Sequence, residues 1–290
     1  MPVLPNQDRI ANEIYEAAAS NFGEHRSYLG MSQIGLPCER ALWLQFRGFT
    51  PHPPDGRVKM IFRLGQHIED EVIYLLKRAG YQIDGQQKSF VAHNGHFRGH
   101  CDGIIYRVTS VPHILEIKSA NDKNFRAFSD QGIRNTNPVY YCQAQCYMGY
   151  SGLSRALFVV QNKNTCKIYT ERIYLNKFDF NDLHQRAYRI ITTNDLPKKQ
   201  FTEDSAFCQW CDYRLQCWYP EEVIMKNRVC GTCHYLGWLN LEKWCHHPEH
   251  SFKILQWGLG CPDWENIFEK NRMEKSRVSL GLINHLEDRK

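Results

Sequence analysis

Apolar residues recur at helical spacing at several points of the chain, and each run predicts a helix. Residues 6–20 carry the first such pattern, with Ile10 and Ile14 on one side. Pro37 stands in the first turn of a second, shorter helix, where a missing amide proton is tolerated. A longer helix stops at Gly80, a residue type that is common just after helix ends. The predicted helices cover about 6–20, 37–46, 58–78, 138–150 and 177–192.

Between the third and fourth helices the pattern changes, and strand-forming residues alternate with polar ones. Asn94-Gly95 and residues 109–112 mark turns in this region, and Asn162–Thr165 marks the turn of a later hairpin. The predicted strands cover about 87–92, 95–107, 113–120, 156–161 and 166–175. This order predicts an α/β fold in which helices flank a mixed central sheet.

One of these strands carries an acid and an amine on the same face. Because successive side chains of a strand alternate, Glu116 and Lys118 point one way. Leu115 and Ile117 point the other way. The preceding strand carries a single acid, Asp102, which converges with Glu116 if the two strands pair as a hairpin. The alternative is an edge strand with a surface Glu–Lys pair and an unrelated Asp, since an isolated E-x-K triplet is common.

The chemistry of such a pair points to a metal ion. Two carboxylates in a partly dry site repel each other unless they are protonated or hold a cation. Oxygen ligands with room for water and phosphate favour Mg²⁺ or Mn²⁺. The metal would polarise a phosphate and lower the pKa of a bound water molecule. Lys118 would orient that water or stabilise the charge that develops on the phosphate.

Three motifs in order resemble those of the RecB-like branch of the PD-(D/E)xK nucleases. A G-x-x-D motif ends at Asp102, an E-x-K motif contains Glu116 and Lys118, and a Q-x-x-x-Y motif contains Gln143 and Tyr147. The resemblance implies a restriction-endonuclease-like fold in which the Asp and the Glu bind metal and the Lys is catalytic. It also implies that Gln143 and Tyr147, which share one helix face, lie beside the site.

The same family has an upstream helix in which a Gly is followed four residues later by a metal-binding His. In this chain Gly65 is followed four residues later by Glu69, and His67 is out of register. Helix geometry also favours Glu69, because it falls on the apolar side of the helix. Glu69 is therefore the expected third metal ligand, with His67 as the alternative.

Twelve cysteines need an explanation in a protein that we expect to be cytoplasmic, where disulfides are rare. Metal binding is the usual meaning of closely spaced cysteines in such a protein. Cys208, Cys211 and Cys217 supply three soft ligands. The fourth is Cys38 by resemblance to the iron–sulfur members of the RecB-like group, such as AddB-type and CRISPR-adaptation nucleases. The resemblance implies a [4Fe–4S] cluster, although thiolates alone also fit zinc.

A second set of cysteines follows the region that the family covers. Its C-x2-C spacing is a strong zinc signal, and four thiolates complete a tetrahedral site. His246, His247 or His250 would replace one thiolate, or would be solvated loop residues. The nearby tryptophans would form a small core or stack on nucleobases. The set consists of Cys230, Cys233, Cys245 and Cys261, and the tryptophans are Trp238, Trp244, Trp257 and Trp264.

Charge and composition add little to this prediction. The formal charge of +5 suits a nucleic-acid partner without requiring one, and a hydrophobic content of 42% is typical of a globular chain. We expect no signal peptide and no membrane partner, because no apolar run is long enough to span a bilayer. We expect the protein to act in the cytoplasm, which would be the cytoplasm of the host cell if a phage encodes the protein. We expect a nuclease domain over 1–226, which includes the iron–sulfur staple, and a cysteine-rich metal-binding tail over 227–290.

The resemblance implies a DNA exonuclease that acts in recombination or DNA-end processing. Similarity to phage-encoded recombination nucleases covers most of residues 30–175. The first alternative is an endonuclease. The second is a DNA-binding protein that does not cleave DNA. The third is a metal-bound interaction module that serves a helicase or a single-strand annealing protein. Lys123, Arg126 and Arg134 would contact DNA phosphates next to the site, or would form a solvated helix face.

Overall fold

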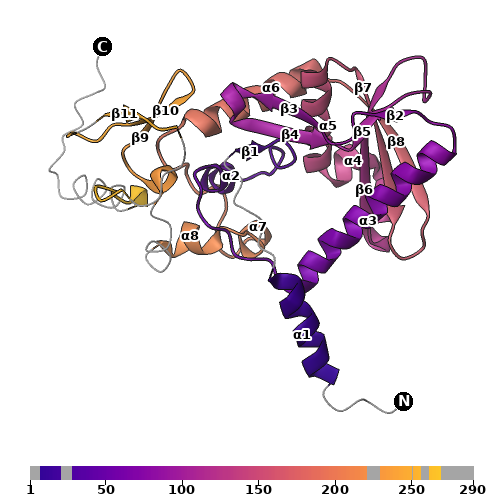
Figure 1. The fold of residues 1–290 in the computed structure, drawn as a ribbon, viewed down its shortest axis with the longest axis horizontal. Coiled ribbons are helices and arrows are strands. Elements are labelled where there is room, and N and C mark those ends of the chain that lie inside the picture. The colour runs from indigo at the N-terminus through magenta and orange to yellow at the C-terminus, as the bar shows by residue number, and fades with distance from the viewer. Residues whose placement is uncertain (1–6, 21–27, 221–228, 250, 256–260, 269–290) are drawn as a thin grey trace. The chain divides into compact units, whose positions relative to one another are not determined.

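The computed structural model describes residues 7–20, 28–220, 229–249, 251–255 and 261–268. They form two compact units (Figure 1). The first unit comprises Met1–Glu24, Tyr28–Pro37 and Pro53–Tyr188, and the second comprises His25–Ser27, Cys38–His52 and Arg189–Lys290. The expected division into 1–226 and 227–290 stays a prediction, and the second unit contains Cys38 together with both C-terminal cysteine groups.

The first unit is built on a mixed five-stranded sheet of order β2-β5-β6-β7-β8. Strands β6 and β7 pair in parallel, whereas the other neighbours are antiparallel. A parallel pair needs a long crossover, which is here made by two helices, α4 and α5. The strands are β2 (Ile83–Asp84), β5 (Gly103–Ile105), β6 (His113–Ala120), β7 (Arg155–Asn162) and β8 (Ile168–Tyr174), and the helices are α4 (Asp122–Thr136) and α5 (Pro138–Ser151). The predicted mixed sheet with flanking helices is confirmed.

One face of this sheet is covered by α3 (Gly56–Arg78), the long helix that crosses the strands in Figure 1. Its buried residues Ile68 and Val72 join a hydrophobic cluster with Leu115 and Ile117 of β6. The apolar half of the β6 alternation therefore faces α3, and the polar half is turned to the other face. Helix α1 (Gln7–Ala19) packs against the start of α3, which also belongs to this unit.

A smaller sheet of the same unit has the strand order β1-β4-β3. Its strands are β1 (Leu29–Gly30), β3 (Lys88–Ala92) and β4 (Phe97–Cys101). The sequence pattern predicted one strand over 95–107, but the structure has β4 and β5 with Asp102 between them. The pattern missed this break because one continuous extended segment is compatible with both strands, which pair in different sheets. Asp102 lies where the chain passes from one sheet to the other.

Helix α4 was not among the helices predicted from periodicity, although a helix face with Lys123, Arg126 and Arg134 was one expectation. Its sequence is mostly polar and contains Gly132, which has a left-handed φ of 75°. Helix α5 was predicted within one residue of its observed bounds. It begins at Pro138, with the side chain of Asn137 accepting a hydrogen bond from the Tyr140 amide. Helix α6 (Lys177–Thr192) follows β8, as its pattern predicted. Among the described residues, no helix is both long enough and apolar enough to cross a membrane.

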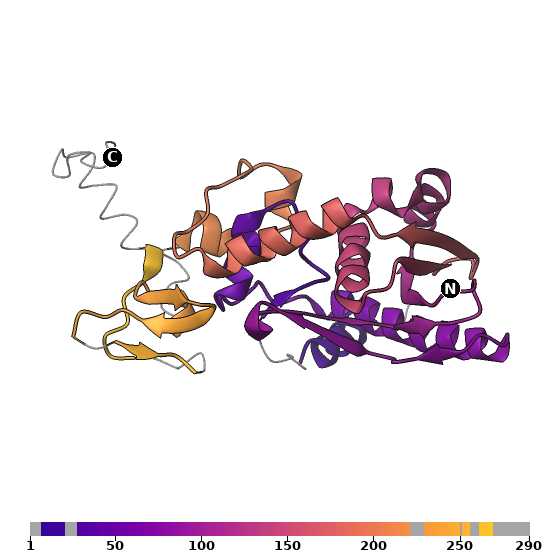
Figure 2. The same cartoon turned by 90° about the horizontal axis from the view of Figure 1, so that it is seen from above.

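The second unit combines short helices with a small antiparallel sheet of order β11-β10-β9, seen in Figure 2. Its core includes the aromatic side chains of α2: Phe46 stacks on Trp238, with ring centroids 5.6 Å apart. Trp238 therefore belongs to a small core, one of the two roles expected for the tail tryptophans. The elements are α2 (Glu39–Phe46), α7 (Ala206–Gln209), α8 (Arg214–Trp218), β9 (Leu236–Leu239), β10 (Glu242–Cys245) and β11 (Phe252–Lys253).

Candidate active site

The polar face of β6 holds the expected acid and amine. Glu116 is fully buried, and its Oε2 lies 2.8 Å from Nζ of Lys118, which is itself mostly buried. Leu115 and Ile117 pack in the core on the other face. A surface Glu–Lys pair on an edge strand does not fit, because β6 has a neighbouring strand on each side.

Asp102 lies opposite Glu116. Strand β5 pairs antiparallel with β6 in the register Gly103↔Leu115, and extending this register by one residue brings Asp102 to Glu116. The amide of Ile117 donates a hydrogen bond of 2.6 Å to Oδ2 of Asp102, which is also buried. The two strands therefore bring together the two acids that are 14 positions apart in the sequence.

Helix α5 contributes an amide and a phenol to the same place. Nε2 of Gln143 donates to Oε2 of Glu116 and to the hydroxyl of Tyr147, each at 3.1 Å. Both side chains are buried. Tyr147 reaches this position because Gly99 has no side chain: a Cβ at residue 99 would lie 2.6 Å from Cε1 of the Tyr147 ring. The glycine of the G-x-x-D motif thus makes room for the tyrosine of the third motif.

The electrostatics of the site show that the carboxylates lack enough compensating charge. Burial, opposed by the charge of Lys118 and assisted by that of Asp102, raises the pKa of Glu116 to about 8. Burial also raises the pKa of Asp102. For Lys118 burial alone would lower the pKa, but the charges of Glu116 and Asp102 raise it above its usual range. The ammonium group is therefore held in its charged form beside two acids.

The donor set fits a hard divalent cation. Oε1 of Glu116 is buried and has no hydrogen-bond partner among the described residues, which is unfavourable unless another group binds there. A cation beside Glu116 and Asp102 would relieve both this unsatisfied atom and the charge repulsion. No group of three or more His, Cys, Asp or Glu side chains in the described ranges is arranged to hold a metal. Mg²⁺ commonly uses only one or two carboxylates, with water and phosphate as its other ligands.

Glu69 and His67 differ in their surroundings on α3. Glu69 is half-buried, and burial and the charge of Asp102 raise its pKa. Its Oε1 accepts a hydrogen bond of 3.0 Å from Gln87. His67 is exposed to solvent. The charge coupling places Glu69 near the two acids, but its role as third ligand stays a prediction.

One residue beside the site was not predicted from the sequence. The ring centroid of Tyr140, in the first turn of α5, lies 5.1 Å from Nζ of Lys118, within the range of a cation–π interaction. The Q-x-x-x-Y motif does not include it, although the predicted helix over 138–150 already places Tyr140 three residues before Gln143 on the same helix face.

The basic residues of α4 are mostly engaged in ion pairs. Arg126 pairs with Asp122 at 2.6 Å, and Arg134 pairs with Asp179 at 3.3 Å. Lys123 is exposed. These contacts fit a solvated helix face, and contacts with DNA phosphates stay a prediction.

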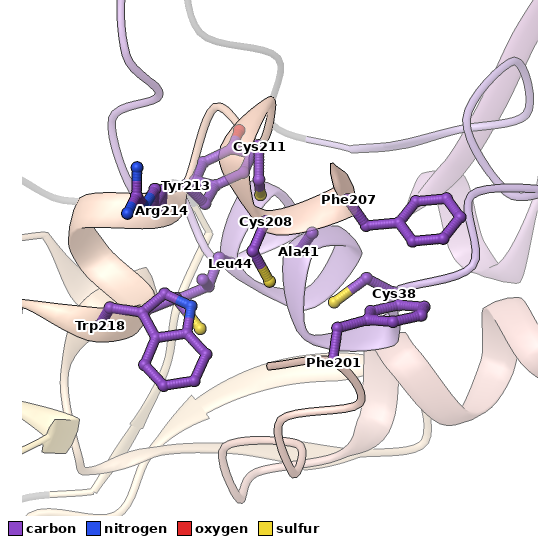
Figure 3. A pocket seen from close by; sticks show the side chains of 11 residues that line it. Cys38, Ala41, Leu44, Phe201, Phe207, Cys208, Cys211, Tyr213, Arg214 and Trp218 are labelled. Atoms are coloured by element: carbon purple, nitrogen blue, oxygen red, sulfur yellow. The ribbon is translucent and has the colours of Figure 1, made fainter. Parts of the chain in front are cut away.

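The first cysteine group lies in the second unit. Cys38, Cys208, Cys211 and Cys217 line one pocket. Figure 3 shows the sulfur atoms of Cys38 and Cys208 turned toward each other among aromatic rings. Burial raises the pKa of Cys211 to about 11 and raises that of Cys217. Cys38 is thus close to residues 170 or more positions later in the sequence, and a metal site shared by these cysteines stays a prediction.

The second cysteine group lines another pocket of the same unit. Its members are Cys230, Cys233, Cys245 and Cys261, and His247 is also part of the lining. His246 packs over Gly237, where a Cβ would lie 2.2 Å from the imidazole ring. His250 lies outside the described residues. The indole of Trp264 donates to the carbonyl of Val229, which indicates a role in packing.

Among the solved structures that resemble the chain are two exonucleases. LHK-Exo, an alkaline exonuclease from Laribacter hongkongensis that was also solved with dAMP, is 14% identical with a TM-score of 0.43, over 62% of this chain and 90% of that chain. SSO0001 is 15% identical with a TM-score of 0.42, over 73% and 95%. A phage-related exonuclease from Haemophilus somnus 129PT is 17% identical with a TM-score of 0.34, over 43% and 66%. No protein-family model and no curated protein matches the chain.

Proposed function

We propose that the protein is a metal-dependent deoxyribonuclease of the PD-(D/E)xK type. The observation that supports this most strongly is the buried carboxylate of Glu116, which contacts Lys118 and Gln143 through one oxygen while the other has no partner among the described residues. A purely structural glutamate would have both oxygens satisfied. A site that binds a cation and a phosphate accounts for the arrangement.

In this proposal Asp102 and Glu116 hold Mg²⁺ or Mn²⁺, with Glu69 as a third ligand. When bound, the metal supplies Lewis-acid polarisation of the scissile phosphate and activation of water. Lys118 stabilises the negative charge that develops on the phosphate, because its ammonium lies in a mostly buried position where charge interactions are strong.

Gln143 and Tyr147 position the carboxylate rather than react. The amide of Gln143 is shared between Oε2 of Glu116 and the Tyr147 hydroxyl, so it fixes the rotamer of a metal ligand. The amide group of Gln143 disfavours protonation of Oε2 of Glu116, since hydrogen bonds to the charged form of an acid favour that form. The helix face that carries both residues therefore serves the metal site.

Exonuclease action in recombination or DNA-end processing is the finer part of the proposal. It rests on the three sequence motifs and their similarity to phage recombination nucleases, with endonuclease action as the alternative. Linear and covalently closed circular DNA incubated with Mn²⁺ separate the two. Degradation of linear DNA alone supports an exonuclease, nicking of circular DNA supports an endonuclease, and cleavage of neither contradicts the nuclease proposal.

The two cysteine groups are proposed to bind metal in the second unit. Cys38, Cys208, Cys211 and Cys217 would hold a [4Fe–4S] cluster, and Cys230, Cys233, Cys245 and Cys261 would hold Zn²⁺. Support comes from the sequence spacing and from the fact that each group lines one pocket. Iron, sulfide and zinc analysis of anaerobically purified protein tests both assignments.

The protein is proposed to act on DNA in the cytoplasm, with a helicase or a single-strand annealing protein as its partner. The mildly basic charge of the chain is compatible with DNA as substrate. Pull-down with a purified single-strand annealing protein and with a purified helicase tests the partner, and absence of any complex contradicts it.

A further inference from the structure

Helix α2 presents two buried arginines that the nuclease site does not use. Arg40 is 8% exposed, and Arg47, the C-cap residue, is fully buried. They are seven residues apart, which corresponds to two helical turns, so they project from similar sides of α2. A guanidinium is almost never fully buried unless an opposite charge or a set of acceptors compensates it. Both residues belong to the second unit.

Arg47 reaches the backbone of the second cysteine group. Its Nε donates to the carbonyl of Gly231 at 2.5 Å, and its Nη2 donates to the carbonyl of Cys233 at 3.2 Å. Its guanidinium lies 4.7 Å from the ring of Trp43. Nη1 is buried without a hydrogen-bond partner, and no carboxylate in the described part of the chain pairs with this cation. Among the described residues, the contacts of the Arg47 guanidinium are thus two backbone carbonyls and the ring of Trp43.

Arg40 is a buried cation near the first cysteine group, as Arg47 is near the second. It donates to the carbonyl of Pro197 at 3.0 Å, and burial lowers its pKa while the nearby Cys217 and Cys38 raise it. Its Nε is buried and unpartnered among the described residues. One helix thus supplies one buried cation to each of the two cysteine groups.

Neutral thiols would leave both cations uncompensated. Four thiolates around one Zn²⁺ carry a double negative charge, whereas three thiolates and a neutral imidazole carry a single one. A double charge next to a buried guanidinium offsets the desolvation of both groups. We infer that the Cys230, Cys233, Cys245 and Cys261 group forms an anionic four-thiolate zinc centre whose counter-ion is Arg47.

This inference rests on the zinc assignment above and makes it more specific. It selects Cys261 over His247 as the fourth ligand, although both line the pocket. It gives Arg47 a positioning and charge-balancing role, since its hydrogen bonds hold the two carbonyls of the C-x2-C segment. It also predicts that each arginine affects only the metal of its own cysteine group.

The test uses the full chain, purified without oxygen, in four variants: Arg47→Met, Arg47→Lys, Arg40→Met and His247→Ala. Bound zinc and iron are measured by elemental analysis, and zinc affinity by competition with a chromophoric chelator. Arg47→Met should lower zinc affinity by about tenfold or more, because it removes the fully buried cation beside the anionic centre. Arg47→Lys should keep it within about threefold, since the charge is retained. Limited proteolysis of residues 229–268 should follow the zinc content.

The controls separate charge balance from packing. Arg40→Met should reduce the metal of the first group and leave the zinc affinity of the second unchanged, and His247→Ala should retain full zinc. Unchanged zinc affinity in Arg47→Met, equal loss of both metals in the two methionine variants, or loss of zinc in His247→Ala each overturns the inference. Wild-type protein without zinc overturns it as well. DNA cleavage measured on the same wild-type sample reports separately on the nuclease proposal.

Discussion

The ring of Tyr147 lies against the backbone of Gly99, so closely that a Cβ at residue 99 would be 2.6 Å from Cε1 of the ring and 3.0 Å from its hydroxyl. The two residues are 48 positions apart and belong to the first and third motifs of the candidate site. Tyr147 in turn accepts a hydrogen bond from Gln143, which also contacts Glu116. The position of Glu116, the proposed metal ligand, is therefore linked through Gln143 and Tyr147 to the absence of a side chain at Gly99.

Gly99→Ala is expected to lower kcat for DNA cleavage about 100-fold, since a displacement of about 1 Å in a catalytic group has effects of this size. Overpacking should also lower the free energy of unfolding by about 1–3 kcal/mol. Gly65→Ala is the matched control: its Cβ would contact only Oγ of Ser119, at 3.7 Å. In the middle of α3, alanine should raise the free energy of unfolding by about 0.5–1 kcal/mol. Steady-state kinetics measures kcat of the two variants, and urea denaturation measures their free energies of unfolding. Full activity of Gly99→Ala would contradict the proposed packing.

Two buried glutamines of α5 should respond differently to the same change. Gln143→Leu removes the donor to Glu116 and should lower kcat about tenfold or more, through loss of a second contact to a metal ligand. Gln145 instead bonds the carbonyl of Tyr174 and the amide of Asn176. Gln145→Leu should lower the free energy of unfolding by about 1–3 kcal/mol, because two partly buried backbone groups lose their partners. Similar activity loss in both variants, after correction for folded fraction, would argue against a role for Gln143 in the site.

The third metal ligand can be identified by titration. Glu69→Gln should raise the Mn²⁺ concentration needed for half-maximal cleavage by about tenfold, as expected when one carboxylate ligand is lost. His67 lies two residues before Glu69 and is exposed, so His67→Gln should leave that concentration unchanged. The reverse order of effects would assign the ligand to His67.

Much of the fold could be read from the sequence because its elements have strong periodicity. The strand over 113–120 was predicted with its observed bounds, and α5 and α6 within one residue. The polar helix α4 could not be predicted from periodicity, since its buried positions are few and Gly132 interrupts them. The break between β4 and β5 was also missed, because it depends on which sheet each strand joins rather than on local residue preference.

The candidate site was visible only in part. The alternation of β6 predicted that Glu116 and Lys118 share a face, and the hairpin pairing that brings Asp102 to them is present. Tyr140 beside Lys118 and the arginines of α2 were not predicted, since their roles arise from three-dimensional neighbours. Assignment of metals to the cysteine groups stays a prediction, because thiolates do not distinguish iron from zinc.

Protein purified without oxygen should be brown, with broad absorption near about 400 nm and about four irons per chain. Cys38→Ser should bleach this absorption, because Cys38 lines the pocket of Cys208, Cys211 and Cys217. Cys166→Ser is the matched control, since Cys166 is exposed in the turn between β7 and β8. Colourless wild-type protein that contains two zinc ions and no iron would contradict the iron–sulfur assignment.

The nuclease proposal depends on Asp102, Glu116 and Lys118 acting as one site. The most direct measurement is the rate of cleavage of linear double-stranded DNA with Mn²⁺ by the wild type, Asp102→Asn and Lys118→Ala, alongside the exposed control Asp130→Asn on α4. The account predicts that wild type and control cleave at similar rates. It predicts a loss of at least about 100-fold in the other two variants, because each removes a metal ligand or the charge that stabilises the transition state. DNA binding by fluorescence anisotropy and the far-UV spectrum should be unchanged, and a folded Asp102→Asn or Lys118→Ala protein that cleaves DNA at the wild-type rate would contradict the account.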